Sequence, residues 1–197
     1  MTLSSPPTIK TQLERLYERY NRRQWVHPDP LEFLYEYSGQ GDREVMGVIA
    51  SSLAYGRVCQ ILKSVDKVRE RMGPSPHRFV MEATSSSLRT TFRHFKHRFT
   101  SGEELAMLLE GLGHVISRYG SLYNCFLSGF SEEHRDILPA LSALVRALSL
   151  RFRGRCNSLL PSPEKGSACK RLNLFMRWMV RRDRVDPGGW YDISPEN

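Results

Sequence analysis

The sequence predicts an all-α protein, a compact array of about eight helices that forms one domain over residues 1–197. Apolar residues return every three or four positions through nearly the whole chain, which places them on one face of successive helices. No stretch alternates between apolar and polar residues for long enough to indicate a β-strand. A chain of 197 residues can bury a proper core and is too short to favour two domains.

The first two predicted helices lie on either side of a proline-rich break. Apolar spacing indicates one helix around residues 9–20 and another around residues 31–37. The segment between them, residues 26–30, reads Val-His-Pro-Asp-Pro and should be extended, because a residue before proline avoids the α conformation. The most apolar predicted helix follows over residues 45–68, and we expect it to run through the middle of the core.

Residues 77–99 give a weaker signal, a short helix followed by mixed aromatic and basic residues. Phe92, Phe95 and Phe99 recur at i, i+3 and i+7, so helix packing explains these rings better than base stacking does. A capping pattern at Ser101 then begins a helix over residues 103–119.

A further helix is expected from residue 136 to about residue 152, and a helix-hairpin-helix-like element over about 140–182. Its first helix should end near residues 155–156, and the second should begin after Gly166 with Ser167 as the N-cap. At about 100° per residue, that second helix has one apolar and one cationic face. The apolar face holds Leu172, Phe175, Met176, Met179 and Val180, and the opposite face holds Lys170, Leu174, Arg177 and Arg181.

The composition excludes several classes of protein. The N-terminus has no basic stretch followed by an apolar run, and no apolar segment approaches the thickness of a bilayer. The four cysteines lie far apart, which fits idle thiols in a reducing compartment better than zinc or disulfides. His94 and His97 have spacing for a metal edge, but a surface basic turn is the stronger interpretation. We therefore expect a cytoplasmic monomer without membrane span, metal or cofactor.

The excess positive charge belongs to one segment. Residues 146–184 hold eleven basic and two acidic residues, a formal charge of +9, whereas the rest of the chain sums to −1. A field of this sign attracts polyanions, so nucleic acid is the first partner to consider. A solvated basic face without a partner is about equally compatible with the charge alone.

Lys170 lies near the amino end of the predicted second helix, where amide N–H groups and the helix dipole favour a phosphate. A lysine in that place is a candidate nucleophile that would form a Schiff base with C1′ of a sugar. By composition alone, a phosphate-binding or solvated lysine is the more common case.

Five stretches of the chain resemble a bacterial family catalogued as domain of unknown function 2400. They are residues 16–22, 27–34, 42–57, 166–181 and 185–190, and the resemblance covers nearly the whole chain. That family in turn resembles, more distantly, the helix-hairpin-helix DNA glycosylases, especially the archaeal 8-oxoguanine type.

The glycosylase resemblance implies roles for particular residues. Lys170 matches the catalytic lysine, which attacks C1′ of a flipped, damaged nucleotide. Lys165, Ser167, Arg171, Arg177 and Arg181 would bind the DNA backbone. Tyr55 and Arg57 match the segment that fills the gap left by the extruded base, although a core tyrosine beside a helix kink at Gly56 is an equally good interpretation.

Two departures weaken the enzymatic interpretation. The closely spaced cysteines of iron–sulfur glycosylases are missing, so no cluster is expected. The family also continues past residue 197 to an Asp that matches the glycosylase carboxylate, and neither Asp183, Asp186 nor Asp192 matches that position; Asp186 fits a turn cap. Either the chain is incomplete at its C-terminus or this member lacks the general base, and in both cases we expect little or no glycosylase turnover.

Three hypotheses follow. The first is a DNA-binding protein of base-excision glycosylase type, and the second is a non-catalytic module that binds duplex DNA or structured RNA. The third is an adaptor whose basic segment meets an acidic protein.

Overall fold

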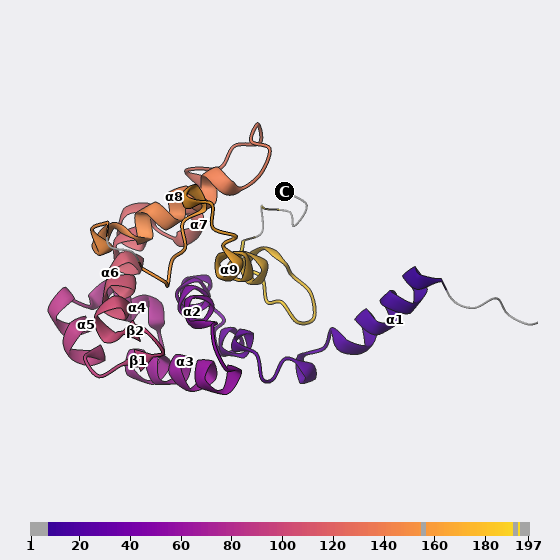
Figure 1. Ribbon diagram of the computed structural model, residues 1–197, viewed down its shortest axis with the longest axis horizontal. Helices are drawn as coiled ribbons and strands as arrows, with labels where there is room; N and C mark the ends of the chain where they lie inside the picture. Colours follow the sequence, from indigo (N-terminus) through magenta and orange to yellow (C-terminus); the bar gives the residue numbers. More distant parts are fainter. Residues whose placement is uncertain (1–7, 155–156, 191–192, 194–197) are drawn as a thin grey trace, which may run out of the picture.

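Helices account for nearly all of the regular structure in this chain (Figure 1). The computed structural model describes residues 8–154, 157–190 and 193. Its α-helices are α1 (Ile9–Tyr20), α2 (Gln40–Leu53), α3 (Val58–Met72), α4 (Pro76–Glu82), α5 (Ser85–Phe92), α6 (Gly102–Tyr119), α7 (Leu122–Leu127), α8 (Leu138–Leu148) and α9 (Lys170–Val180). Short 3-10 helices cover Arg23–Trp25, Pro30–Glu36, Leu150–Phe152 and Pro163–Lys165. The all-α prediction is confirmed, and no described helix is long and apolar enough to cross a membrane.

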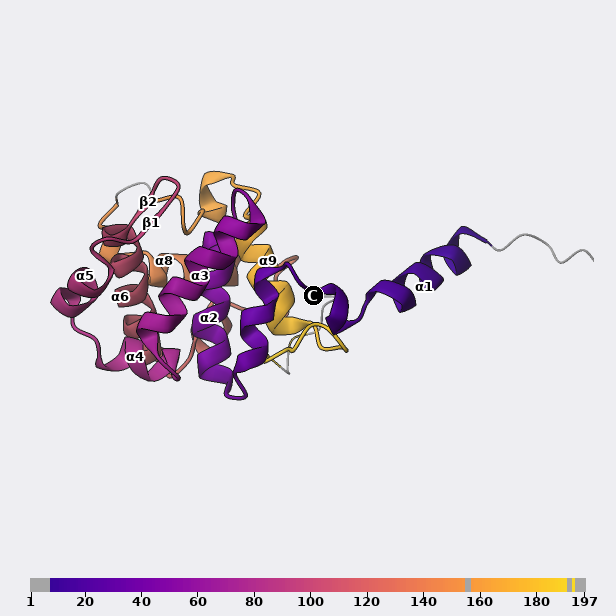
Figure 2. The ribbon, with the colours of Figure 1, turned by 90° about the horizontal axis from the view of Figure 1, so that it is seen from below.

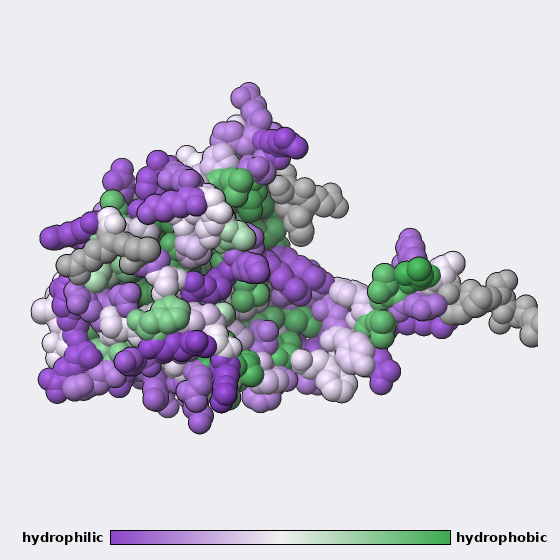
Figure 3. Space-filling view, viewed as in Figure 1, coloured by the Kyte–Doolittle hydropathy of each residue, from purple (hydrophilic) through white to green (hydrophobic). Residues whose placement is uncertain are grey.

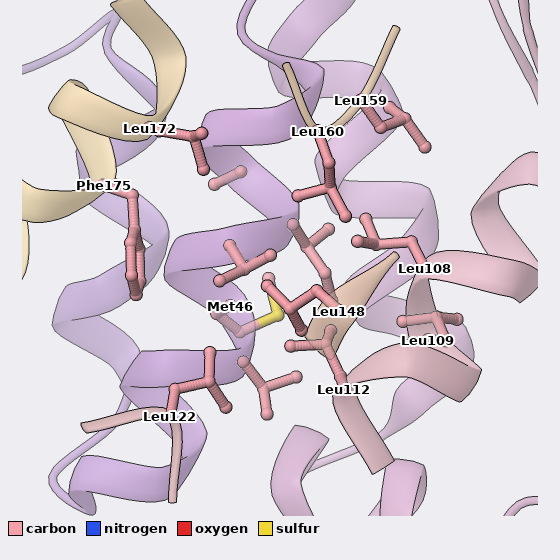
Figure 4. Close-up of a cluster of buried hydrophobic side chains, with 14 of the residues drawn as sticks. Met46, Leu108, Leu109, Leu112, Leu122, Leu148, Leu159, Leu160, Leu172 and Phe175 are labelled. Carbon is pink, nitrogen blue, oxygen red and sulfur yellow. The ribbon is translucent and has the colours of Figure 1, made fainter. Parts of the chain in front are cut away.

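Helix α2 lies in the middle of the core, and all its residues from Glu44 to Leu53 are buried. Helix α9 packs directly on α2, and Gly47 permits this close approach because a Cβ there would lie 3.1 Å from the ring of Phe175. Figure 4 shows Met46 of α2 among leucines of α6, α7 and α8 and beside Phe175 of α9. The deep position of α2 agrees with its apolar sequence.

One buried carboxylate joins three parts of this core. Glu44 of α2 is 1% exposed and accepts hydrogen bonds from the indole Nε1 of Trp190 (2.8 Å), the backbone N–H of Leu122 (2.8 Å) and the side-chain amide of Gln40 (3.0 Å). A buried charge is tolerated when donors satisfy it in this way. Glu44 thereby fixes the start of α7 and the segment after α9 against α2.

The predicted single helix over residues 45–68 is wrong, because the chain breaks between Leu53 and Val58. Gly56, within the break, has a φ of 97°, which side-chain-bearing residues rarely adopt. Both helices are apolar on the face that meets the core. The apolar spacing therefore continues from α2 into α3, and the sequence pattern does not show where the helix breaks. The corner leaves Tyr55 half-buried beside Gly56.

A small β-hairpin replaces the helical stripe that we predicted for Phe92, Phe95 and Phe99. Helix α5 ends at Phe92, and strands β1 (Lys96–His97) and β2 (Thr100–Ser101) pair antiparallel. Arg98 turns the chain with a φ of 54°. As a result Phe92 and Phe95 are buried, whereas Phe99 is 64% exposed at the hairpin tip. Two-residue strands are too short to produce an alternating pattern in the sequence.

The helix-hairpin-helix element that we predicted over about 140–182 is not confirmed, and its helices begin and end at other residues than we predicted. Helix α8 ends at Leu148, and α9 begins at Lys170, two residues later than the predicted N-cap Ser167 would require. The N-cap is Cys169, which adopts a left-handed conformation, and the Ser167 hydroxyl instead accepts a hydrogen bond from its N–H (3.2 Å). Residues 155–156, where we expected the first helix to end, lie outside the described residues.

Candidate nucleic-acid interface

Four side chains from distant parts of the chain meet at the corner between α2 and α3. The ring of Tyr55 stacks on Phe99, with centroids 5.0 Å apart and planes at 21°, and meets the edge of His97 at 4.6 Å. The guanidinium of Arg171 lies 5.0 Å from the Tyr55 ring centroid. We call Tyr55, His97, Phe99 and Arg171 the Tyr55 cluster. Two predicted site residues, Tyr55 and Arg171, are thus brought into contact.

Hydrogen bonds fasten the β-hairpin to this corner. The Tyr55 hydroxyl donates to the backbone oxygen of His97 (2.9 Å) and lies 2.6 Å from the Thr100 hydroxyl. Nε2 of His97 lies 3.1 Å from the Tyr55 backbone oxygen, and Nδ1 lies 2.9 Å from the Ser64 hydroxyl of α3. A neutral imidazole satisfies both contacts by donating from Nε2 and accepting at Nδ1.

His97 is therefore an interior residue. The surface basic turn that we predicted for His94 and His97 is wrong for His97. Its side chain is 2% exposed, whereas His94 is exposed and bonds Arg93. Burial lowers the pKa of His97 below its usual value. Hydrogen bonds to backbone oxygens raise this pKa, but the charges of Arg98 and Arg171 lower it further, so the net shift is downward. Within the described residues, no group of three or more His, Cys, Asp or Glu side chains could hold a metal ion.

Arg171 connects α9 to this corner. Its guanidinium donates to the backbone oxygen of Ser52, near the end of α2 (2.5 Å), and to that of Ser158 in the loop before α9. Burial lowers the pKa of Arg171, with a partly offsetting contribution from Tyr55, but a guanidinium stays charged in proteins. Among the described residues no carboxylate pairs with it. The structure therefore places this predicted phosphate contact on neutral carbonyl groups and an aromatic face.

Exposed basic and polar residues lie on the segments next to the cluster in the sequence. Lys170 is the first residue of α9, Lys165 and Ser167 precede it on the loop, and Arg57 precedes α3; all four are exposed. Figure 2 shows the β-hairpin, the start of α3 and the loop before α9 along one edge of the molecule. Figure 3, which views this edge face-on, shows mostly hydrophilic side chains with scattered apolar ones. Lys165 and Ser167 also line a groove of about 560 Å³ between the loop and α8.

The other two predicted phosphate contacts lie at the far end of α9. Arg177 pairs with Asp186 (3.2 Å), and Arg181 pairs with Asp183 (2.7 Å) and Asp186 (3.2 Å). Arg181 also contacts Tyr17 of α1. At about 1.5 Å per residue, Arg181 lies about 16 Å along the helix from Lys170. The cationic face predicted from the sequence therefore differs between its two ends. Among the described residues, Lys170 at the amino end has no acidic partner, whereas Arg177 and Arg181 at the neutralised end are paired with acids.

The two acids at the neutralised end have different tasks. Asp183 forms the turn cap by accepting from the backbone N–H groups of Val185 (2.7 Å) and Asp186 (2.8 Å). Asp186, which we predicted as the cap, is fully buried and holds the arginines instead. Burial raises the pKa of Asp186 against the lowering effect of Arg177. Burial would also raise the pKa of Asp183, but its hydrogen bonds hold it well below the usual range. Asp192 lies outside the described residues.

Phe99 and Arg98 belong to this candidate interface, and we did not predict them as site residues from the sequence. Their only signal is the alternation of aromatic and basic residues over positions 92–99, which we assigned to a helix face. The positive φ at Arg98 produces the turn that exposes Phe99.

Residues 29–197 match the family described as "Protein of unknown function (DUF2400)". The chain belongs to this family. The match confirms the family resemblance for the stretches at 42–57, 166–181 and 185–190 and for most of 27–34, whereas residues 16–22 lie outside it. Comparison of this DUF2400 protein with curated proteins and with solved structures finds no match. The more distant resemblance to glycosylases therefore stays an expectation.

The burial of His97 predicts an acid sensitivity of the DUF2400 fold. Because its folded-state pKa is lowered, the unfolded chain gains the proton first as the pH falls through about 6.5. This contribution to stability is complete above that pH and is lost as the pH approaches the lower, folded-state pKa. Urea unfolding at pH 7.5 and 5.5 should show a smaller loss of unfolding free energy in His97→Gln than in the wild type. Exposed His134→Gln is the control, and an equal loss in all three proteins would contradict the assignment.

Proposed function

We propose that this protein binds DNA through the edge formed by the Tyr55 cluster and the start of α9. The proposal rests on which basic side chains are paired with acids and which are not. Exposed Arg57, Arg98, Lys165 and Lys170 form no ion pair among the described residues, whereas Arg177 and Arg181 are held by Asp183 and Asp186. Unpaired cations are available for phosphate groups without the cost of breaking an ion pair.

The start of α9 supports the same surface. Its cap residue, Cys169, makes no side-chain hydrogen bond to the first turn. A helix start of this kind has N–H groups and a positive dipole end, which favour an anion such as a backbone phosphate. The exposed Lys170 adds a full charge at the same place. Contacts of this type fix the protein on DNA without reading the base sequence.

The glycosylase resemblance adds a more specific proposal, in which Lys170 is a nucleophile toward C1′ of a damaged nucleotide. Its exposure at the amino end of α9 is compatible with that role. The described acids that follow α9 are unsuited to assist it, because Asp183 and Asp186 are held by arginines at the opposite end of the helix. We therefore propose DNA binding as the main function and expect little glycosylase turnover.

Two matched double variants test the DNA proposal. Lys165→Ala/Lys170→Ala should weaken binding of undamaged duplex and reduce the slope of log K against log salt by about one unit per lost phosphate contact. Arg15→Ala/Arg19→Ala removes the same charge from α1, away from this edge, and should leave both quantities near their wild-type values. Fluorescence anisotropy at several salt concentrations measures both.

Equal losses in the two doubles would indicate a general charge effect and refute this surface. A flat salt response of the wild type would refute nucleic-acid binding. Capture of an acidic protein that survives nuclease treatment, together with a flat response, would favour the adaptor hypothesis.

Borohydride trapping tests the nucleophile. On a duplex with an abasic site, an attacking amine forms a Schiff base that borohydride reduces to a stable adduct. We expect an adduct with the wild type and with Lys165→Ala, and none with Lys170→Ala. An adduct of undiminished yield from Lys170→Ala would overturn the role of Lys170 while leaving DNA binding intact.

A further inference from the structure

Phe99 is an exposed aromatic ring on a rigid support. It is 64% exposed, although it stacks on Tyr55 at 5.0 Å. The stack covers one side of the ring and leaves most of the side chain accessible. A single exposed apolar residue does not by itself indicate a binding site. The contacts that hold this ring and the residues around it are therefore decisive.

The support is fixed by the contacts of the Tyr55 cluster. The hydrogen bonds of Tyr55 and His97 join both strands of the hairpin to the corner between α2 and α3. Arg98, the other turn residue, lies against Gly56, where a Cβ would come within 2.8 Å of its side chain. A ring that is held in place before binding loses little conformational entropy when a ligand stacks on it.

The surroundings of the ring are cationic. Lys96 and Arg98 of the hairpin and Arg57 of the neighbouring corner are exposed and form no ion pair among the described residues. A purely apolar protein partner would have to desolvate these charges without compensation. A nucleotide offers both a flat aromatic base and a phosphate, so its chemistry matches a ring flanked by cations.

From this geometry we propose that Phe99 is a stacking platform for an unpaired base of bound DNA. The inference rests on the proposed DNA binding and deepens it by naming the preferred ligand as DNA that contains an unpaired nucleotide. Inside a continuous duplex both faces of each base are already stacked on its neighbours. Only a base outside the stack, or at a strand end, can offer a face to Phe99.

Two duplexes of identical length test the proposal, one fully paired and one with a single unpaired nucleotide. The wild type should bind the second more tightly. Phe99→Ala should lose about tenfold in affinity for the duplex with the unpaired nucleotide, the range typical of one base stacked on an aromatic ring, and keep its affinity for the paired duplex. Phe99→Trp should retain the preference. Trp25→Ala is the control, because Trp25 is a 55% exposed ring next to Tyr20 at the base of α1.

The outcomes separate the two proposals. If the wild type binds neither duplex, the proposed function fails. If it binds DNA but Phe99→Ala changes neither affinity, or lowers both equally, the platform is overturned and the function stands. A fluorescent adenine analogue at the unpaired position gives a second readout, since stacking quenches it. We expect quenching by the wild type and Trp25→Ala but not by Phe99→Ala, and equal quenching by all three would contradict the proposal.

Discussion

The arrangement of this surface depends on the hydrogen bonds and the ring contact that the guanidinium of Arg171 makes. This guanidinium joins the first turn of α9 to the carbonyl groups of Ser52 and Ser158 and to the ring of Tyr55. A partly buried cation with only neutral partners is costly unless each donor is satisfied. The end of α2 is a favourable place for it, because the last carbonyl groups of a helix carry partial negative charge. Arg171 thus holds Lys170 near the aromatic corner.

The two ends of α9 use their charges in opposite ways. At the far end, Asp183 and Asp186 hold Arg177 and Arg181, and Asp183 and Arg181 also bond Tyr17 of α1. At the near end Arg171 is turned inward, and the exposed charge is left to Lys170 and the residues around the hairpin. The segment with a formal charge of +9 is therefore partly structural, and we propose that phosphate groups bind only at its near end.

The helices and the two faces of α9 could be predicted from the sequence, because burial of an apolar stripe every 3.6 residues leaves a clear pattern. Leu172 and Phe175 are buried, and Lys170 is exposed, as that pattern requires. The Tyr55 cluster could not be predicted. It depends on a left-handed Arg98, on a corner at Gly56 and on an arginine paired with carbonyl groups, and tertiary contacts decide all three. The resemblance indicated Tyr55, but its partner Phe99 was assigned to a helix.

Hydrogen exchange of the protein with and without DNA that carries an unpaired nucleotide tests the central claim, that the corner, the hairpin and the start of α9 form one interface. The account predicts slower exchange on binding in residues 54–58, 96–101 and 165–172, with little change in residues 177–186. Slower exchange confined to residues 177–186, where the charges are already neutralised, would contradict it.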